Sequence, residues 1–149
     1  MNVAPAWPDL AGRIEGGRHR LPVRVYFEDT DFSGLAYHGS FVRWCERGRS
    51  EWLRLLGVHH HELINASKPA AFVVRRLTID YLKPARIDET LEVVSSLVSL
   101  TAATLTLSQQ VQRERTVIAS AEVLVVLIDT DGRPARMPAR LKAALGGAS

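Results

Sequence analysis

The sequence has little cysteine and no long apolar run, and both absences narrow the class of protein. Cys45 is the only cysteine among the 149 residues, so neither an internal disulfide nor a thiolate metal cluster is available. No segment reaches the roughly 20 apolar residues that a membrane-spanning helix requires. The first 21 residues also lack the apolar stretch of a signal peptide. These features predict a cytoplasmic protein without a membrane span.

Several sequence motifs of known enzyme classes are missing as well. There is no Gly-rich phosphate loop, no Gly-x-Ser-x-Gly elbow and no GxGxxG pattern, which argues against nucleotide hydrolysis, serine-hydrolase chemistry and dinucleotide binding. The run His59-His60-His61-Glu62 suggests a metal site, but Asn65 stands where the zinc-protease pattern His-Glu-x-x-His requires its second histidine. We therefore expect no metal and favour a solvated helix start for the histidines.

The composition is that of one soluble globular domain. Hydrophobic residues make up 46% and charged residues 23% of the chain, which allows an ordinary core. The formal charge of +3 suits an anionic partner, but Lys and Arg are spread along the chain. A phosphorylated small molecule fits this charge as well as nucleic acid does, and nucleic acid is not indicated.

The order of patterns predicts the domain organisation. Prolines and the Gly16-Gly17 pair interrupt any regular pattern in residues 1–20, so these are expected to be a poorly ordered lead-in. Residues 21–138 are expected to form one domain, and residues 139–149 a C-terminal tail.

Hydrophobic periodicity predicts an α+β domain. Residues 22–27 alternate as a half-buried strand does, residues 39–56 repeat at helical spacing, and residues 59–67 form a short helix or loop. Four strand-like runs follow, at 76–81, 91–98, 104–111 and 117–128. Because the apolar faces of a sheet and a helix must be buried against another layer, this order predicts one antiparallel sheet curled about one long helix. Because such a sheet leaves an edge and an outer face uncovered, we expect at least a dimer.

The chemistry is expected in Glu28-Asp29-Thr30-Asp31, three carboxylates in four residues. Crowding of this kind raises the energy of ionised carboxylates and favours a proton acceptor. The alternative is a solvated turn in which Asp31 only caps nearby backbone donors. The segment leads into a helix N-terminus, whose unpaired N–H groups can hold a developing negative charge. A carboxylate beside such a helix end suits acyl transfer.

The same segments resemble the YbgC family of acyl-CoA thioesterases, within the 4-hydroxybenzoyl-CoA thioesterase group. The likeness runs from about residue 22 to residue 138. The segments that carry it are Val23 to Asp31, Gly34, Tyr37 to Phe41, Glu46-Arg47, Ala71 to Arg76, Tyr81 to Arg86 and Ala121 to Val126. The resemblance implies a hotdog fold, in which an antiparallel sheet wraps around one long central helix. It also implies hydrolysis of an acyl-CoA thioester without a cofactor, since coenzyme A is part of the substrate.

By this resemblance, Asp31 is the catalytic aspartate, acting either as nucleophile or as the base that activates water. The backbone N–H of His38 is implied to polarise the thioester carbonyl, while the His38 side chain either orients water or substrate or makes a structural hydrogen bond. Gly34 and Tyr37 are expected on the substrate side, with an ordinary buried aromatic as the alternative for Tyr37. Phe32 departs from the family pattern and reshapes the expected acyl pocket.

The basic residues in and around the predicted strand 76–81 are candidates for the phosphates of coenzyme A, namely Arg75, Arg76, Lys83 and Arg86. Lys83 and Arg86 are the main candidates, and the alternative is outward-facing strand charge, which is the preferred interpretation for Arg76. For Glu46 we favour a surface ion pair with Arg43 or Arg49 over a place in the site.

The main prediction is therefore hydrolysis of acyl-CoA to a free carboxylic acid and coenzyme A by a homodimer or homotetramer. A non-catalytic module that binds acyl-carrier protein or an envelope-associated partner, such as one of the Tol-Pal system, is the first alternative, because fold alone does not establish activity. Dehydration of a hydroxyacyl thioester is the second.

Overall fold

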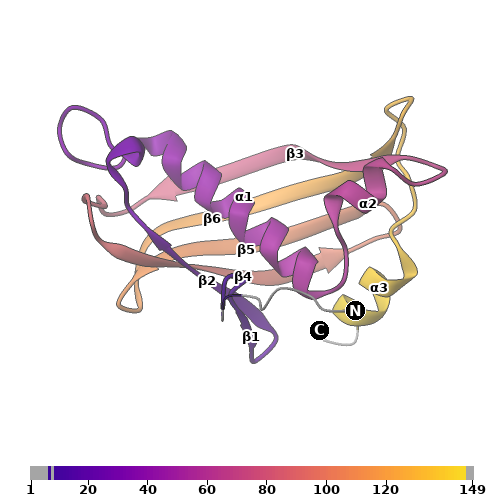
Figure 1. Ribbon diagram of the computed structural model, residues 1–149, viewed down its shortest axis with the longest axis horizontal. Helices are drawn as coiled ribbons and strands as arrows, with labels where there is room; N and C mark the ends of the chain where they lie inside the picture. Colours follow the sequence, from indigo (N-terminus) through magenta and orange to yellow (C-terminus); the bar gives the residue numbers. More distant parts are fainter. Residues whose placement is uncertain (1–6, 8, 147–149) are drawn as a thin grey trace.

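The computed structural model describes residue 7 and residues 9–146, and it shows one six-stranded antiparallel sheet with a long helix packed on one face (Figure 1). The sheet order is β1-β2-β4-β5-β6-β3, so β3 crosses over to pair with β6 at the edge opposite β1. In chain order the elements are β1 (Arg13–Glu15), β2 (Arg18–Arg24), the 3-10 helix η1 (Phe27–Asp29), α1 (His38–Leu55), α2 (His60–Ile64), β3 (Ala70–Tyr81), β4 (Thr90–Leu100), β5 (Thr104–Arg113), β6 (Thr116–Asp129) and α3 (Ala139–Gly146).

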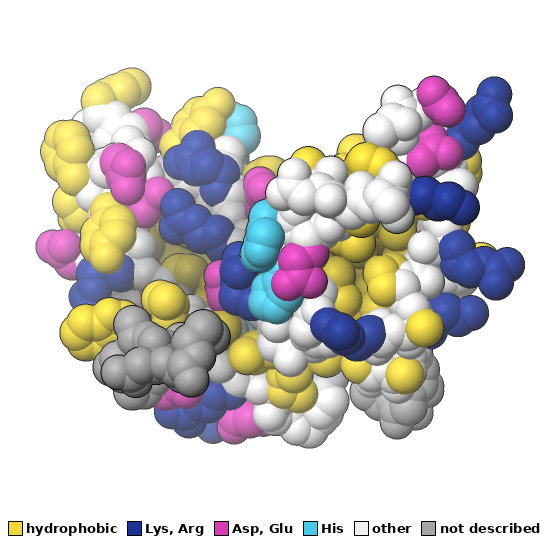
Figure 2. Space-filling model, turned by 45° about the vertical axis from the view of Figure 1, so that its right-hand side comes forward, with side chains coloured by type: hydrophobic (Ala, Val, Ile, Leu, Met, Phe, Trp, Pro, Cys, Tyr) yellow, Lys and Arg dark blue, Asp and Glu magenta, His cyan; other side chains and the backbone are white. Residues whose placement is uncertain are grey.

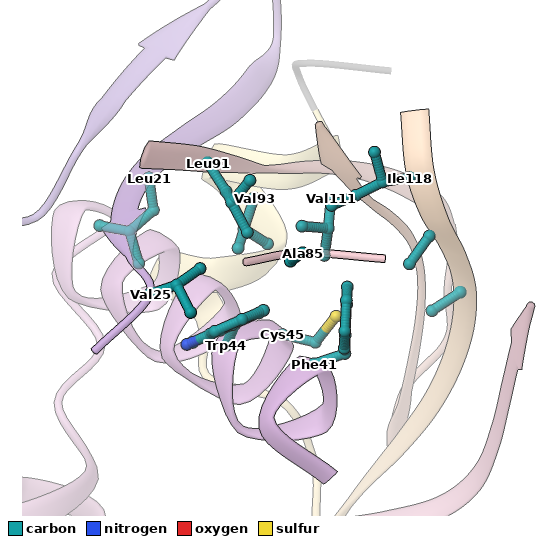
Figure 3. Close-up of a cluster of buried hydrophobic side chains, with 12 residues drawn as sticks. Leu21, Val25, Phe41, Trp44, Cys45, Ala85, Leu91, Val93, Val111 and Ile118 are labelled. Atoms are coloured by element: carbon teal, nitrogen blue, oxygen red, sulfur yellow. The ribbon is translucent and has the colours of Figure 1, made fainter. Parts of the chain in front are cut away.

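Helix α1 forms where helical spacing predicts it and buries one face against the sheet. Phe41, Trp44 and Cys45 point from the first half of α1 into a cluster of side chains from β2, β4, β5 and β6 (Figure 3). Trp52 and Leu53 from its second half enter a second cluster with β5, β6 and α3. This arrangement confirms the predicted α+β architecture and fixes the N-terminus of α1 above the sheet.

The N-terminal region is more ordered than the lead-in predicted for residues 1–20, as far as the structure describes it. Gly16 and Gly17 have φ angles of +58° and +76°, which glycine adopts without strain, and they form the two-residue turn of a hairpin between β1 and β2. His19 on β2 is fully buried. The glycine pair is thus a hairpin turn and not a chain breaker. The rest of the predicted lead-in, residues 1–6 and 8, lies outside the described residues.

Further boundaries differ from the sequence-based expectation. The strand predicted at 22–27 is β2, which ends at Arg24, and Phe27 begins the 3-10 helix η1. The predicted tail contains α3, whose Leu141 and Leu145 are buried in the second core cluster. Strand β3 begins at Ala70, six residues earlier than predicted. The prediction missed its first half because Val73 and Val74 are both exposed at the sheet edge, which interrupts the alternation of buried and exposed side chains.

The surface agrees with the scattered charge seen in the sequence. Lys and Arg side chains are spread over the face shown in Figure 2, with acidic and hydrophobic side chains between them. Within the described ranges, no helix is both long and apolar enough to cross a membrane.

Candidate active site

An open concavity of about 390 Å³ lies at the N-terminal end of α1. It brings together four of the residues singled out in the sequence, namely Asp31, Tyr37, His38 and Lys83. Gly34 and Arg86, also singled out, do not line it. The remaining lining residues are Leu35, Ala36, Phe41, Tyr81, Leu82 and Pro84. The candidate site is therefore built from the loop before α1, the first turn of α1 and the end of β3.

A tight turn presents Asp31 to this concavity. The Gly34 N–H donates to the Asp31 carbonyl at 3.1 Å, and Gly34 has a φ of +82°, a conformation that favours glycine. The loop then pairs with the segment after β3, through a bridge between Leu35 and Arg86 and a 2.8 Å hydrogen bond from Ala36 N–H to the Ala85 carbonyl. Gly34 and Arg86 thus contribute to the site through their backbones.

The Asp31 carboxylate is exposed and held ionised by its own turn. The Ser33 N–H donates to Oδ1 of Asp31 at 2.8 Å, and the Ser33 hydroxyl donates to the same oxygen. These two hydrogen bonds, the hydroxyl's first, lower the pKa of Asp31 below its ordinary value. The expectation that crowded acids would favour protonation of Asp31 is therefore wrong, because the Ser33 donors lower its pKa by more than desolvation raises it. A carboxylate that stays ionised is what a nucleophile or a general base requires.

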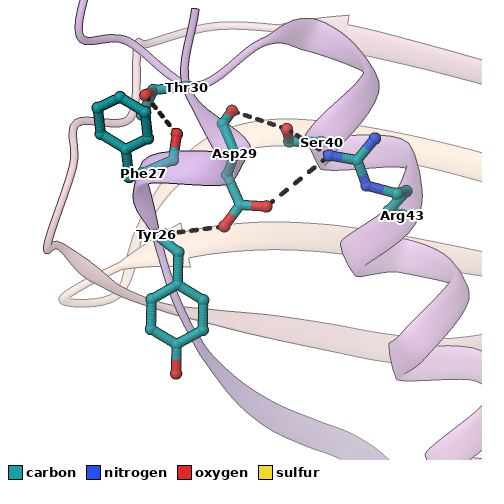
Figure 4. A network of polar contacts seen from close by, with 6 residues as sticks. All are labelled: Tyr26, Phe27, Asp29, Thr30, Ser40 and Arg43. Atoms are coloured by element: carbon teal, nitrogen blue, oxygen red, sulfur yellow. Dashed lines mark hydrogen bonds and ion pairs between the residues drawn. The ribbon is translucent and has the colours of Figure 1, made fainter.

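Asp29, two residues earlier, is buried and structural (Figure 4). Its carboxylate accepts a 2.9 Å hydrogen bond from the Tyr26 N–H and lies 3.8 Å from the Arg43 guanidinium. Its carbonyl accepts from the Ser40 hydroxyl at 2.8 Å and from the Tyr37 N–H at 2.8 Å. Asp29 therefore ties the acidic segment to the first turn of α1.

These bonds determine which N–H groups at the start of α1 remain available. The Tyr37 N–H is used by Asp29, and the Ser40 N–H donates to the Tyr37 carbonyl at 2.9 Å. The N–H groups of His38 and Gly39 have no acceptor in the part of the chain that the structure describes. They are the first two residues of α1, where unpaired donors and the helix dipole attract negative charge. Asp31 thus lines the same concavity as the N-terminus of α1, whose first two N–H groups have no acceptor among the described residues.

Aromatic rings frame this helix end. The rings of Tyr37 and His38 lie with centroids 4.1 Å apart, and Tyr37 is about half exposed, so it is not the ordinary buried aromatic considered as its alternative. The Tyr81 hydroxyl donates to the His38 carbonyl at 2.9 Å, and burial raises the pKa of the Tyr81 phenol. Sequence reasoning missed Tyr81 as a site residue, because it is 43 residues from His38 and was assigned only to a strand.

Two other residues singled out in the sequence lie outside this concavity. Glu46 makes no ion pair within 4.0 Å among the described residues, contrary to the predicted surface pair: Arg43 contacts Asp29, and Arg49 donates to Gln109 at 3.0 Å. His60, in the histidine run, lies 3.3 Å from the Ser50 hydroxyl.

Comparison with known proteins agrees with this fold. Residues 25–145 match the family described as the thioesterase-like superfamily. The acyl-CoA thioester hydrolase YbgC of Escherichia coli O6:H1 is 45% identical over 113 residues, which are 74% of this chain and 81% of that protein. The acyl-CoA thioesterase YbgC of Haemophilus influenzae is 36% identical over 125 residues, covering 83% of this chain and 91% of that protein.

Solved structures show the same fold. The crystal structure of a probable thioesterase from Bartonella henselae superposes with a TM-score of 0.78 at 35% identity, covering 81% of this chain and 99% of that one. A 1,4-dihydroxy-2-naphthoyl-CoA thioesterase from Synechocystis gives a TM-score of 0.81 at 21% identity over 87% of this chain and 96% of that one, and supports the fold alone. The predicted hotdog fold is confirmed, and the chain belongs to the YbgC family of acyl-CoA thioesterases within the thioesterase-like superfamily.

Proposed function

We propose that the chain hydrolyses acyl-CoA thioesters, with Asp31 as the reacting carboxylate and the backbone N–H of His38 as an oxyanion donor. One observation carries the proposal: Asp31, kept ionised by Ser33, shares an open concavity with the unpaired N–H groups at the start of α1. Acyl transfer needs this pair, since a nucleophile or base must act beside donors that stabilise the tetrahedral oxyanion.

Two routes lead from this arrangement to the same products. In one, an Asp31 oxygen attacks the thioester carbonyl, the C–S bond breaks, and water hydrolyses the resulting anhydride. In the other, Asp31 takes a proton from a water molecule that attacks the carbonyl directly. In both, the carbonyl oxygen becomes negative next to the N–H groups of His38 and Gly39, and the thiolate of coenzyme A leaves and is protonated. The donors act without reorganisation because the backbone on either side of them is held: the Tyr37 N–H donates to the Asp29 carbonyl, and the His38 carbonyl accepts from the Tyr81 hydroxyl.

The surroundings of Asp31 suggest how substrate binds. Lys83 lines the concavity and is exposed, which suits a phosphate of coenzyme A. The Arg86 side chain is also exposed, and the Arg86 backbone pairs with Leu35 in the loop that carries Asp31. The half-exposed ring of Tyr37 offers an apolar contact for the acyl group. Coenzyme A enters as part of the substrate, and the proposed chemistry uses no other cofactor.

The test is release of free thiol from a panel of acyl-CoA substrates of increasing chain length. Replacing Asp31 with Asn removes the charge but keeps the shape of an exposed side chain, so turnover is expected to fall by about 10²-fold or more while the unfolding transition stays unchanged. Asp131→Asn, an exposed acid in the turn after β6, is the matched control and keeps the wild-type rate. An Asp31→Asn rate equal to wild type across the panel would overturn the role of Asp31.

The same panel separates the alternative. Wild type that releases no thiol from any acyl-CoA, yet captures acyl-carrier protein or an envelope-associated partner, would favour a binding module. As part of the proposal we place the enzyme in the cytoplasm, where acyl-CoA is made and used, as a homodimer or homotetramer.

A further inference from the structure

The first turn of α1 has no capping side chain of its own. Tyr37 precedes the helix, and its side chain makes no capping hydrogen bond among the residues that the structure describes. A Ser, Thr, Asp or Asn at this position would use one of the first N–H groups of the helix. The helix therefore starts with the N–H groups of His38 and Gly39 open, and other elements must hold its first turn.

One of these outside contacts comes from Tyr81, the last residue of β3, whose end lies beside the start of α1 (Figure 1). The Tyr81 hydroxyl donates to the His38 carbonyl at 2.9 Å. In an α-helix such a carbonyl also accepts the N–H four residues later, and its oxygen can accept two hydrogen bonds. The helix therefore forms without the Tyr81 hydroxyl, and Tyr81 is 44% exposed. Stability alone does not require this bond.

The carbonyl that Tyr81 contacts belongs to the same peptide group as the Gly39 N–H. A hydrogen bond to the oxygen of a planar peptide group fixes the plane and polarises the N–H, since linked hydrogen bonds strengthen one another. Gly39 has no side chain to restrain its backbone, and a Cβ there would lie 2.7 Å from a carbon of the Tyr37 ring. Tyr81 thus restrains the open donor that has the most conformational freedom of its own.

The Tyr81 hydroxyl is itself held in place from two sides. The N–H groups of Leu82 and Lys83 both donate to the Ile118 carbonyl, at 2.9 and 3.1 Å, which fixes the backbone that follows β3. The Tyr81 ring packs edge-on against Phe41, with ring centroids 5.3 Å apart. Burial raises the pKa of the phenol, so the hydroxyl keeps its proton at neutral pH and can donate it.

We infer that Tyr81 is a positioning residue for the proposed hydrolysis: its hydroxyl orients the peptide between His38 and Gly39, so that the Gly39 N–H serves as a second oxyanion donor. The inference rests on the proposed function and adds a residue that acts through the backbone of α1. The oxyanion forms only as the thioester carbonyl is attacked, so the hydroxyl is expected to act on kcat and to leave KM nearly unchanged.

Tyr81→Phe tests this role, because it removes the hydroxyl and keeps the ring against Phe41. Release of free thiol from acyl-CoA is expected to show a kcat about tenfold lower, with KM within about twofold of wild type. The midpoint of urea unfolding and the acidic limb of the pH–rate profile are expected to stay the same, since that limb reports Asp31. Tyr26→Phe, which removes a hydroxyl from an exposed tyrosine outside the concavity, is the matched control and keeps the wild-type kcat.

The peptide group can also be followed without turnover. In amide NMR spectra of the full chain, the Gly39 signal is expected to differ between wild type and Tyr81→Phe, while the signal of Gly48, further along the same helix, stays in place. A wild-type kcat in Tyr81→Phe, a change in KM alone or an unmoved Gly39 signal would each overturn the inference. If wild type releases thiol and Asp31→Asn does not, that failure leaves the proposed function intact. Wild type that releases no thiol overturns the proposed function, and this inference with it.

Discussion

At the scale of single residues, two aspartates separated by one residue have opposite environments. Asp29 is 3% exposed and accepts hydrogen bonds at both its carboxylate and its carbonyl, while Asp31 is exposed and bonded only within its own turn. Asp29→Ala is expected to lower the free energy of unfolding by about 1–3 kcal/mol, because the part-buried hydrogen bond from the Tyr26 N–H to the Asp29 carboxylate is lost. Asp31→Ala is expected to change it by no more than about 0.5 kcal/mol. Urea unfolding measures both, and equal losses would contradict the structural role given to Asp29.

The hydroxyl of Ser33 sets the acidic limit of the proposed reaction. Its hydrogen bond is the main cause of the lowered pKa of Asp31. Because Asp31 must be ionised to act, activity is lost as the pH falls through that pKa. Ser33→Ala removes the hydroxyl but keeps the backbone donor, so it is expected to raise the pKa and move the acidic limb of the pH–rate profile to higher pH. Ser33→Thr keeps a hydroxyl and serves as the control; a limb at the same pH in wild type and Ser33→Ala would count against this account.

The sequence pointed to the acidic segment but could not assign roles within it. Asp29 and Asp31 have the same side chain and lie in the same turn, and the donors that distinguish them come from the first turns of α1 and from Ser33. The resemblance to a known family selected Asp31, whereas local crowding suggested a wrong direction for its pKa. Tyr81 reaches His38 only through the crossover that brings β3 beside α1, so no local pattern indicated it.

At the scale of elements, the contact between α1 and the sheet depends on the absence of a side chain at position 48. A Cβ on Gly48 would lie 2.8 Å from Val93 and 3.2 Å from Gln109. Gly48→Ala gains up to about 1 kcal/mol in helix propensity, but overpacking costs about 1–3 kcal/mol. A net loss of stability is therefore expected. Arg47→Ala, at the exposed neighbouring position, lacks the clash and is expected to match or exceed wild type in the same urea unfolding measurement. A Gly48→Ala protein more stable than wild type would show that α1 can shift away from β4.

Hydrophobic periodicity predicted α1 and the later strands because their buried faces follow a regular period. It failed where that period is interrupted. Val73 and Val74 are both exposed on the edge strand β3, so the sequence of its first half lacks the alternating pattern of a half-buried strand. The hairpin of β1 and β2 was missed because two adjacent glycines suit a tight turn as well as a chain break, and only strand pairing decides between them.

At the scale of the whole molecule, the two edges of the sheet differ. The β1 edge is three residues long and carries Arg13 and Glu15, features that discourage pairing with another sheet. The β3 edge is twelve residues long, and Val73 and Val74 are 38% and 48% exposed along it. Among the described strands, β3 pairs only with β6. A long edge with exposed apolar side chains invites strand pairing, which is the form that the predicted dimer would take.

Light scattering at micromolar concentration tests this association, with an expected mass of at least twice the 16.5 kDa of one chain. Val74→Lys places a charge on the edge strand and is expected to shift the mass toward a single chain, because strand pairing would bury that charge without a partner. Val98→Lys, at an exposed position of the interior strand β4, adds the same charge away from the edge and keeps the wild-type mass. A wild-type protein that stays at 16.5 kDa would contradict the dimer. A Val98→Lys protein that dissociates as Val74→Lys does would place the contact on the sheet face.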